Sequence, residues 1–90
     1  MTNEVFKLLV EKSEGKEWVA SLGDERGQVR YVERRSAVQP AVKEVVNWLI
    51  DYALKTDTTV SMLVFIEGVM AAFNQFRPRK DGKIDLVSIP

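Results

Sequence analysis

The chain has 90 residues, of which 46% are hydrophobic and 29% are charged, and its 13 basic side chains balance its 13 acidic ones. This composition is typical of one small folded domain, and it argues against a disordered chain and against a strong net field for nucleic acid or membranes. The sequence contains no cysteine and no histidine. Disulfides, thiolate metal sites and histidine chemistry are therefore excluded, and we expect no metal and no cofactor.

The N-terminal residues MTNEVFKLLV do not resemble a secretory signal. Glu4 stands where such a signal needs a basic start, and Lys7 interrupts the apolar run. The apolar stretch 60–73 is shorter than the about 20 residues that span a bilayer, and Glu67 lies near its middle. We therefore expect a cytoplasmic protein without a membrane span.

The first third of the chain is predicted to form an antiparallel three-stranded meander. Its strands are expected at residues 4–12, 17–22 and 28–35. The segments KSEGK and GDERG separate them, and each places a glycine, Gly15 or Gly27, where a hairpin loop needs a positive φ. Because the first strand has apolar residues on both faces, we expect it to be central in the sheet or covered on both sides.

A helix is the alternative structure for the first segment. Asn3 can cap such a helix and Gly15 can end it. Val5, Leu8 and Leu9 fit one face of a helix as well as they fit a strand. The pattern leaves both structures open.

The middle of the chain is predicted to form a two-helix hairpin. Pro40 suits the first turn of a helix, and residues 41–55 carry an apolar arc wider than half the helix circumference. The segment 56–58, Thr-Asp-Thr, supplies a cap for a second helix that runs to about Phe76 and is ended by Pro78.

A turn at Asp81 and Gly82 is followed by alternating residues 83–89, which predict a last strand. The predicted fold is thus a single α+β domain over residues 1–90. It consists of a β-meander at 1–38, a helix pair at 39–77, and a turn with a short C-terminal strand at 78–90. The helices are expected to pack on one face of the sheet.

The predicted helices are too apolar for one sheet face to cover. On a helical wheel the second helix has large side chains on one side and small ones on the other, where a further helix could approach closely. The leading hypothesis is therefore a small non-catalytic interaction or regulatory module that binds itself as a homodimer or binds another protein. The predicted interface consists of Trp48, Tyr52, Val64, Gly68, Ala71 and Ala72.

Nucleic-acid binding is the second hypothesis. A sheet that carries arginines and an aromatic side chain such as Tyr31 can hold a single strand by phosphate contacts and stacking. This requires the third strand and the segment 77–83 to meet on one face; otherwise their charges form a solvated edge that discourages aggregation. The residues that would make the contact are Arg30, Arg34, Arg77, Arg79 and Lys80.

Signals for catalysis are weak. Glu67 among aliphatic residues could have a raised pKa, but no second carboxylate accompanies it, and it could equally lie at the edge of the apolar arc and reach water. The chain has no GxGxxG or GxxxxGK spacing. A helix-turn-helix is disfavoured because Phe65, Met70 and Phe73 stand where base-reading polar side chains are needed. We expect no enzyme and no small-molecule substrate.

Overall fold

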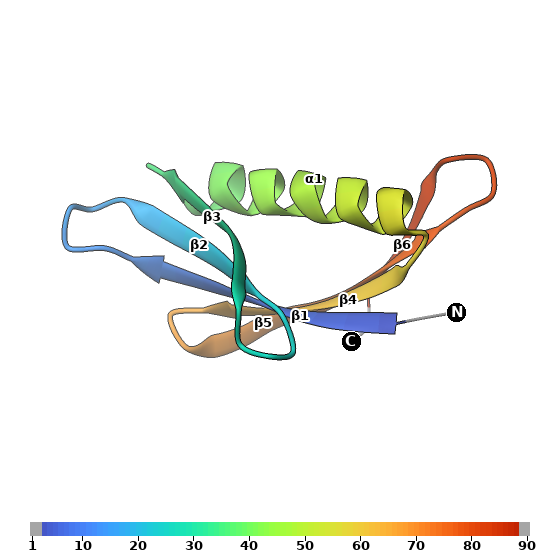
Figure 1. Cartoon of the computed structure of the whole chain (residues 1–90). Helices are drawn as coiled ribbons and strands as arrows, with labels where there is room; N and C mark the ends of the chain where they lie inside the picture. Colours follow the sequence, from blue (N-terminus) through green and yellow to red (C-terminus); the bar gives the residue numbers. More distant parts are fainter. Residues whose placement is uncertain (1–2, 89–90) are drawn as a thin grey trace.

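The computed structural model describes residues 3–88, which form one helix and six strands (Figure 1). The strands make a single sheet in the order β3-β2-β1-β4-β5-β6. The helix lies along one face of this sheet, and no other element covers the opposite face. The elements in chain order are β1 (Asn3–Lys12), β2 (Trp18–Gly23), β3 (Val29–Arg35), α1 (Val38–Thr56), β4 (Thr59–Ile66), β5 (Val69–Pro78) and β6 (Ile84–Ser88).

The N-terminal third is an antiparallel meander in which β1 pairs with β2, and β2 with β3. The segment 4–12 is therefore a strand, and the alternative of a helix that begins at Asn3 is wrong. β1 also pairs in parallel with β4, so it lies in the interior of the sheet with neighbours on both sides. This position accounts for the apolar residues on both faces of β1.

The predicted two-helix hairpin is wrong, because the residues after α1 form a β-hairpin. β4 and β5 pair antiparallel and are joined by Glu67 and Gly68, with φ of 50° and 79°. Positive φ at both positions is the geometry of a type I′ turn, whose twist matches that of two adjoining strands. The segment is rich in β-branched and aromatic residues, which fit a pleated sheet better than a helix.

The helix ends where the second helix was expected to begin. Asp57 adopts a left-handed conformation with φ of 50°, and the Thr58 N–H donates to the Ala53 carbonyl oxygen at 3.1 Å. This is the geometry of a helix C-terminal cap, which turns the chain away from the helix axis. Residues 56–58 therefore end α1 and lead directly into β4 instead of capping a further helix.

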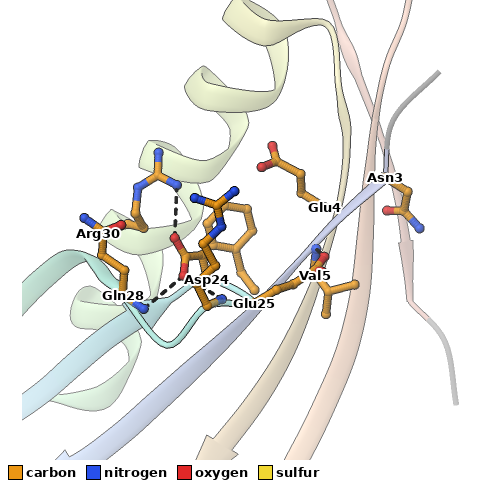
Figure 2. A pocket seen from close by; sticks show the side chains of 9 residues that line it. Asn3, Glu4, Val5, Asp24, Glu25, Gln28 and Arg30 are labelled. Atoms are coloured by element: carbon orange, nitrogen blue, oxygen red, sulfur yellow. Dashed lines mark hydrogen bonds and ion pairs between the residues drawn. The ribbon is translucent and has the colours of Figure 1, made fainter.

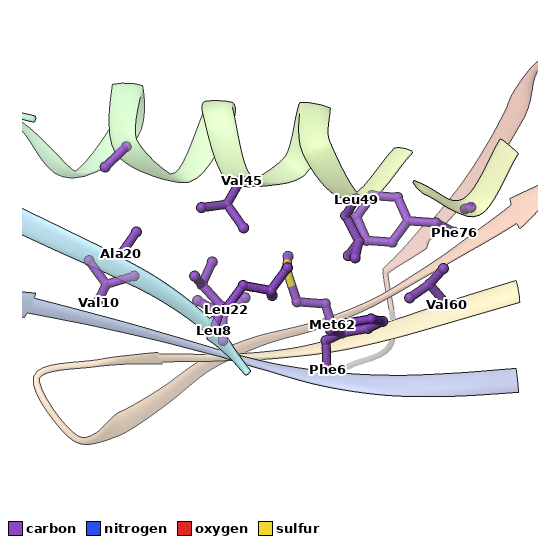
Figure 3. Close-up of a cluster of buried hydrophobic side chains, with 13 residues drawn as sticks. Phe6, Leu8, Val10, Ala20, Leu22, Val45, Leu49, Val60, Met62 and Phe76 are labelled. Carbon is purple, nitrogen blue, oxygen red and sulfur yellow. The ribbon is translucent and has the colours of Figure 1, made fainter. Parts of the chain in front are cut away.

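The core lies between α1 and the sheet face beneath it (Figure 3). The helix buries a stripe at every fourth residue, formed by Ala41, Val45, Leu49 and Ala53. Burying each large apolar side chain contributes about 1.5–3 kcal/mol. The sheet residues opposite this stripe are Phe6, Leu8, Val10, Ala20, Leu22, Val60, Met62, Val64 and Phe76.

Within the described residues 3–88, no helix combines the length and the apolarity that crossing a membrane would require.

Two substitutions in the β4–β5 turn distinguish a hairpin from a helix, because each changes the free energy of unfolding in opposite directions in the two structures. Gly68→Ala should destabilise the hairpin by about 1 kcal/mol, because alanine is strained at positive φ. Glu67→Asn should stabilise it by about 0.5 kcal/mol, since asparagine tolerates this conformation better.

In a helix both signs would be reversed, because alanine is a better helix former than glycine and asparagine a worse one than glutamate. Denaturant unfolding of the two variants and the unmodified protein measures the differences. A more stable Gly68→Ala variant would contradict the hairpin.

Candidate functional site

The sheet face opposite α1 is the largest feature that the core leaves unused. Side chains alternate along each strand, so the residues between the core positions point to this second side. We call it the open face. Its side chains are those of Val5, Lys7, Leu9, Glu11, Val19, Ser21, Val29, Val32, Arg34, Ser61, Leu63, Phe65, Met70, Phe73, Gln75, Arg77, Asp85 and Val87.

Two rows of cross-strand partners run across the open face. The first row, the Leu9 row, is Val32–Ser21–Leu9–Phe65–Met70. The second, the Lys7 row, is Val29–Gly23–Lys7–Leu63–Phe73. Several of these apolar side chains are strongly exposed, with values of 40% for Leu9, 44% for Val32, 52% for Met70 and 57% for Val29. Contiguous exposed apolar surface of this kind marks interaction sites in soluble proteins.

Of the residues that the structure describes, five with charged side chains lie on the open face; Lys7 and Glu11 flank Leu9 on β1, whereas Arg34, Arg77 and Asp85 belong to β3, β5 and β6. The Lys7 ammonium lies 5.5 Å from the centroid of the Phe65 ring, which attracts the cation. Glu11 lies two residues beyond Leu9 on the same side of the strand, so about 13 Å of strand separates it from Lys7. Within the described residues 3–88, neither Lys7 nor Glu11 forms an ion pair.

A hollow of about 340 Å³ lies on the open face between β1 and the turn that joins β2 to β3. Its floor and walls include Val5, Leu9, Leu63 and Val29. Gly23 has no side chain to fill this space, and its pairing with Lys7 ends the β1–β2 ladder. The open face is therefore recessed at this place, where a larger apolar side chain of a partner could enter.

A more polar pocket of about 470 Å³ adjoins the N-terminal half of β1 (Figure 2). Here the Asp24 carboxylate accepts hydrogen bonds from the Arg26 N–H at 3.0 Å and the Gln28 N–H at 2.9 Å, and it pairs with Arg30 at 3.5 Å. Desolvation acts to raise the pKa of Asp24, but these interactions outweigh it and the pKa is lowered. The carboxylates and guanidinium in this pocket thus largely satisfy one another.

Glu25 closes the edge of β1 that β2 leaves unpaired. Its Oε1 atom accepts a hydrogen bond from the Val5 N–H at 2.9 Å. A strand edge with free N–H groups invites pairing with another chain. The Glu25 side chain therefore occupies the hydrogen-bond position that a further strand would use. Pairing of another chain with this part of β1 is thereby opposed.

An aromatic cluster anchors Arg30 on the helix side of the sheet. Its guanidinium lies 5.3 Å from the ring centroid of Tyr52 and 6.0 Å from those of Trp48 and Phe6. Trp48 stacks on Tyr31 at 5.8 Å and on Tyr52 at 5.4 Å. These contacts join β3 and β1 to α1, so the cluster stabilises the fold.

Both tyrosines of the cluster donate to carboxylates. The Tyr52 hydroxyl donates to Glu4 at 2.6 Å, and the Tyr31 hydroxyl donates to Glu33 at 2.7 Å. Removing either phenolic proton would place two negative charges together, so each hydrogen bond raises the pKa of its tyrosine, and desolvation adds to the effect. The same bond from Tyr31, with a second from Arg35, lowers the pKa of Glu33.

Of the six residues predicted as an interface, Val64, Ala71 and Ala72 line one hollow of about 310 Å³ beside α1, and the other three lie elsewhere. Val64 is 5% exposed and belongs to the core, and Gly68 lies in the β4–β5 turn. Ala71 and Ala72 lie on β5, while Trp48 and Tyr52 lie on α1 and stack on each other. The helical period assigned all six residues to one side, whereas the structure brings three of them together, Val64, Ala71 and Ala72.

The five basic residues predicted to contact nucleic acid lie at opposite sides of the sheet. Arg30 and Arg34 belong to β3, whereas Arg77, Arg79 and Lys80 lie at the end of β5 and in the turn after it. β2, β1 and β4 separate β3 from β5, which corresponds to about 19 Å at the usual strand spacing. Arg79 also pairs with Asp81 at 2.9 Å and Asp85 at 3.5 Å.

Glu67 is an exposed residue of the β4–β5 turn and does not lie among aliphatic side chains. The residues that the sequence reasoning missed are those of the open face, above all Leu9, Leu63, Phe65 and Phe73. One signal pointed to them, since β1 was predicted to be apolar on both faces.

Comparison of the chain with family models, curated proteins and solved structures found no match. Within the described residues 3–88, no group of three or more acidic, histidine or cysteine side chains is placed to hold a metal ion. The function must therefore be argued from the open face and its surroundings.

The tyrosine pKa values predict how stability depends on alkaline pH. Both pKa values are raised above the ordinary tyrosine pKa of 10.0, so the folded state retains protons that the unfolded state releases above pH 10. The contribution of the tyrosines is complete below pH 10 and is lost as the pH rises through their folded values. The free energy of unfolding should therefore fall more steeply above pH 10 in the unmodified protein than in the Tyr31→Phe/Tyr52→Phe variant.

Denaturant unfolding at neutral pH and above pH 10 measures this difference. Ultraviolet absorbance of phenolate reports the two groups directly, because the chain contains only these two tyrosines. Equal slopes for the two proteins would contradict the raised pKa values.

Proposed function

We propose that this protein is a non-catalytic interaction module that works by burying the open face against another folded protein. The single observation that carries the proposal is the Leu9 row, in which Val32, Leu9, Phe65 and Met70 extend over four of its five strands with only Ser21 as a polar member. Scattered exposed apolar residues are normal on a monomer, but a row with apolar side chains on four of five adjacent strands is not.

The free energy gained by covering the open face is of the same order as the cost of association. Each square ångström of apolar surface removed from water contributes about 25 cal/mol, so covering about 400 Å² contributes about 10 kcal/mol. Association itself costs an amount of similar size, about 4–15 kcal/mol. The close-packed centre of the face therefore decides the affinity, which agrees with the usual dominance of a few central side chains in interfaces.

Nucleic-acid binding is less well supported by the same face. The open face carries the cations Lys7, Arg34 and Arg77. Together with the rings of Phe65 and Phe73 they could contact a single strand, but aliphatic side chains outnumber them there. Arg30 is held in the aromatic cluster, and the other predicted basic contacts are divided between the two sides of the sheet. A protein partner fits an aliphatic face better than a phosphate backbone does.

Site-specific photo-crosslinking tests the proposal. Phe73, on the open face, is replaced by p-benzoylphenylalanine, which keeps an aromatic ring at that position. The matched control places the same group at Asn47, which is exposed on α1. After irradiation in the native cells, position 73 should yield a protein adduct, including an adduct with the chain itself, and position 47 should not.

Two results would contradict the proposal. One is the absence of a protein adduct at position 73 when the variant is folded, as judged by its circular dichroism. The other is an adduct at position 73 that nuclease removes, which would instead identify the open face as a nucleic-acid interface.

A further inference from the structure

We infer that the partner on the open face is a second copy of this chain, packed so that the two β1 strands run antiparallel about a two-fold axis beside Leu9. This inference rests on the proposed function, because it names the partner of the same face. Two sheets that pack face to face lie about 10 Å apart, and their strands cross at about 30°. The product would be a sandwich with one α1 on each outer side.

The charge order along β1 makes the open face complementary to itself. Lys7 and Glu11 flank Leu9 at equal distances on the same side of the strand. Consider a two-fold axis that lies between the two sheets, perpendicular to β1 and beside Leu9. This axis places Lys7 of one copy opposite Glu11 of the other. Two identical ion pairs form, and they use two groups that have no ion-pair partner among residues 3–88 of their own chain.

The other simple two-fold arrangement is disfavoured by the same charges. An axis parallel to β1 would place Lys7 opposite Lys7 and Glu11 opposite Glu11. Like charges in a partly desolvated interface cost several kcal/mol. The order of charges therefore selects the antiparallel arrangement of the two β1 strands.

The antiparallel arrangement also matches the apolar rows. Because the axis crosses β1 at Leu9, the Leu9 row of one copy faces the Leu9 row of the other, and the strand order is preserved across the interface. The apolar side chains of this row then form the centre, with the two Lys7–Glu11 pairs above and below it. This is the usual anatomy of a protein interface, with an apolar centre and a more polar rim.

The extents of the molecule give an upper limit to the area that a second copy can cover. The molecule measures 43 × 25 × 19 Å, and the shortest dimension corresponds to one helix layer stacked on one sheet layer. The open face therefore occupies a broad side of roughly 1,000 Å², whereas a standard interface buries about 800 Å² per partner. With the axis at Leu9, the second copy covers the parts of β3, β2 and β1 on both sides of Leu9, and on β4 and β5 it covers the ends that carry Phe65 and Met70.

Charge reversal tests both the partner and its orientation. The mass of the purified protein is measured by light scattering at micromolar concentrations. The unmodified chain should have the mass of a dimer. Lys7→Glu and Glu11→Lys should each weaken the dimer at least about tenfold, because each places two pairs of like charges together. The double variant Lys7→Glu/Glu11→Lys should restore it.

The control is Lys80→Glu, which makes the same charge change in the exposed turn between β5 and β6 and should remain dimeric. Circular dichroism confirms that each variant is folded, and crosslinking of purified protein at position 73 gives a second measurement that needs no charge reversal. It should yield an adduct of two chains.

A purified protein that stays monomeric at about 100 μM would overturn the dimer, since specific interfaces of this size are tighter than that. A dimer that the double variant does not restore would overturn the antiparallel arrangement. If position 73 forms adducts with a different protein in cells while the purified chain is monomeric, the second copy is excluded and the proposed interaction function still holds.

Discussion

The parallel pairing of β1 with β4 joins the two halves of this molecule into one sheet. β4 follows α1, so the chain leaves the meander at β3, passes along α1 and returns beside β1. Two three-stranded halves thereby become one six-stranded sheet with β1 and β4 in its middle. Most of the core depends on this pairing, because the residues that face the α1 stripe come largely from β1 and β4 themselves.

Because of the same pairing, the sheet is wider than the single helix that packs on it. Six strands span about 24 Å between the outermost chains, whereas one helix is about 10–12 Å wide with its side chains. α1 can therefore bury the middle of one face and cannot reach the other. Because β1 and β4 are apolar on both sides, their second set of side chains, Leu9, Leu63 and Phe65, remains on the open face. The arrangement that builds the core thus also produces the candidate site.

Parts of the fold were predictable from the sequence where turn residues or the apolar spacing within one element indicate its structure without long-range contacts. Gly27 adopts the predicted positive φ of 81°, whereas the prediction for Gly15 was wrong, because Lys16 has the positive φ of the first loop, 67°. The apolar arc of 41–55 indicated α1. The segment 59–78 was not predictable in the same way, because a strand that is apolar on both faces has no alternation and resembles a helix that is apolar all round. Its turn, Glu67-Gly68, also lacks the usual asparagine or aspartate of a type I′ hairpin.

Because the segment 59–78 was assigned the helical period instead of the strand period, the wrong side chains were predicted to form the site. At 3.6 residues per turn, Val64 falls beside Gly68 and Ala71, and a close helix contact follows. At two residues per repeat, Val64 points into the core while Leu63 and Phe65 point to the open face. An interaction through apolar surface could be inferred from composition and pattern, but which side chains form that surface depends on the period, and the long-range pairing of β1 with β4 decides it.

The edges of the sheet explain why association through the face is favoured over association through a strand. On β3, Arg35 pairs with Glu33 at 2.7 Å and approaches Glu44 of α1 at 3.9 Å, so charged groups line that edge. On the opposite edge, Asp85 of β6 pairs with Arg79. Charged side chains on edge strands oppose edge-to-edge pairing with another sheet. Glu25 accepts a hydrogen bond from the Val5 N–H, where the β1–β2 ladder has ended. These charged groups oppose pairing through the edges of β3 and β6, whereas no such group opposes stacking on the Leu9 row, which is the direction in which a face-to-face partner would approach.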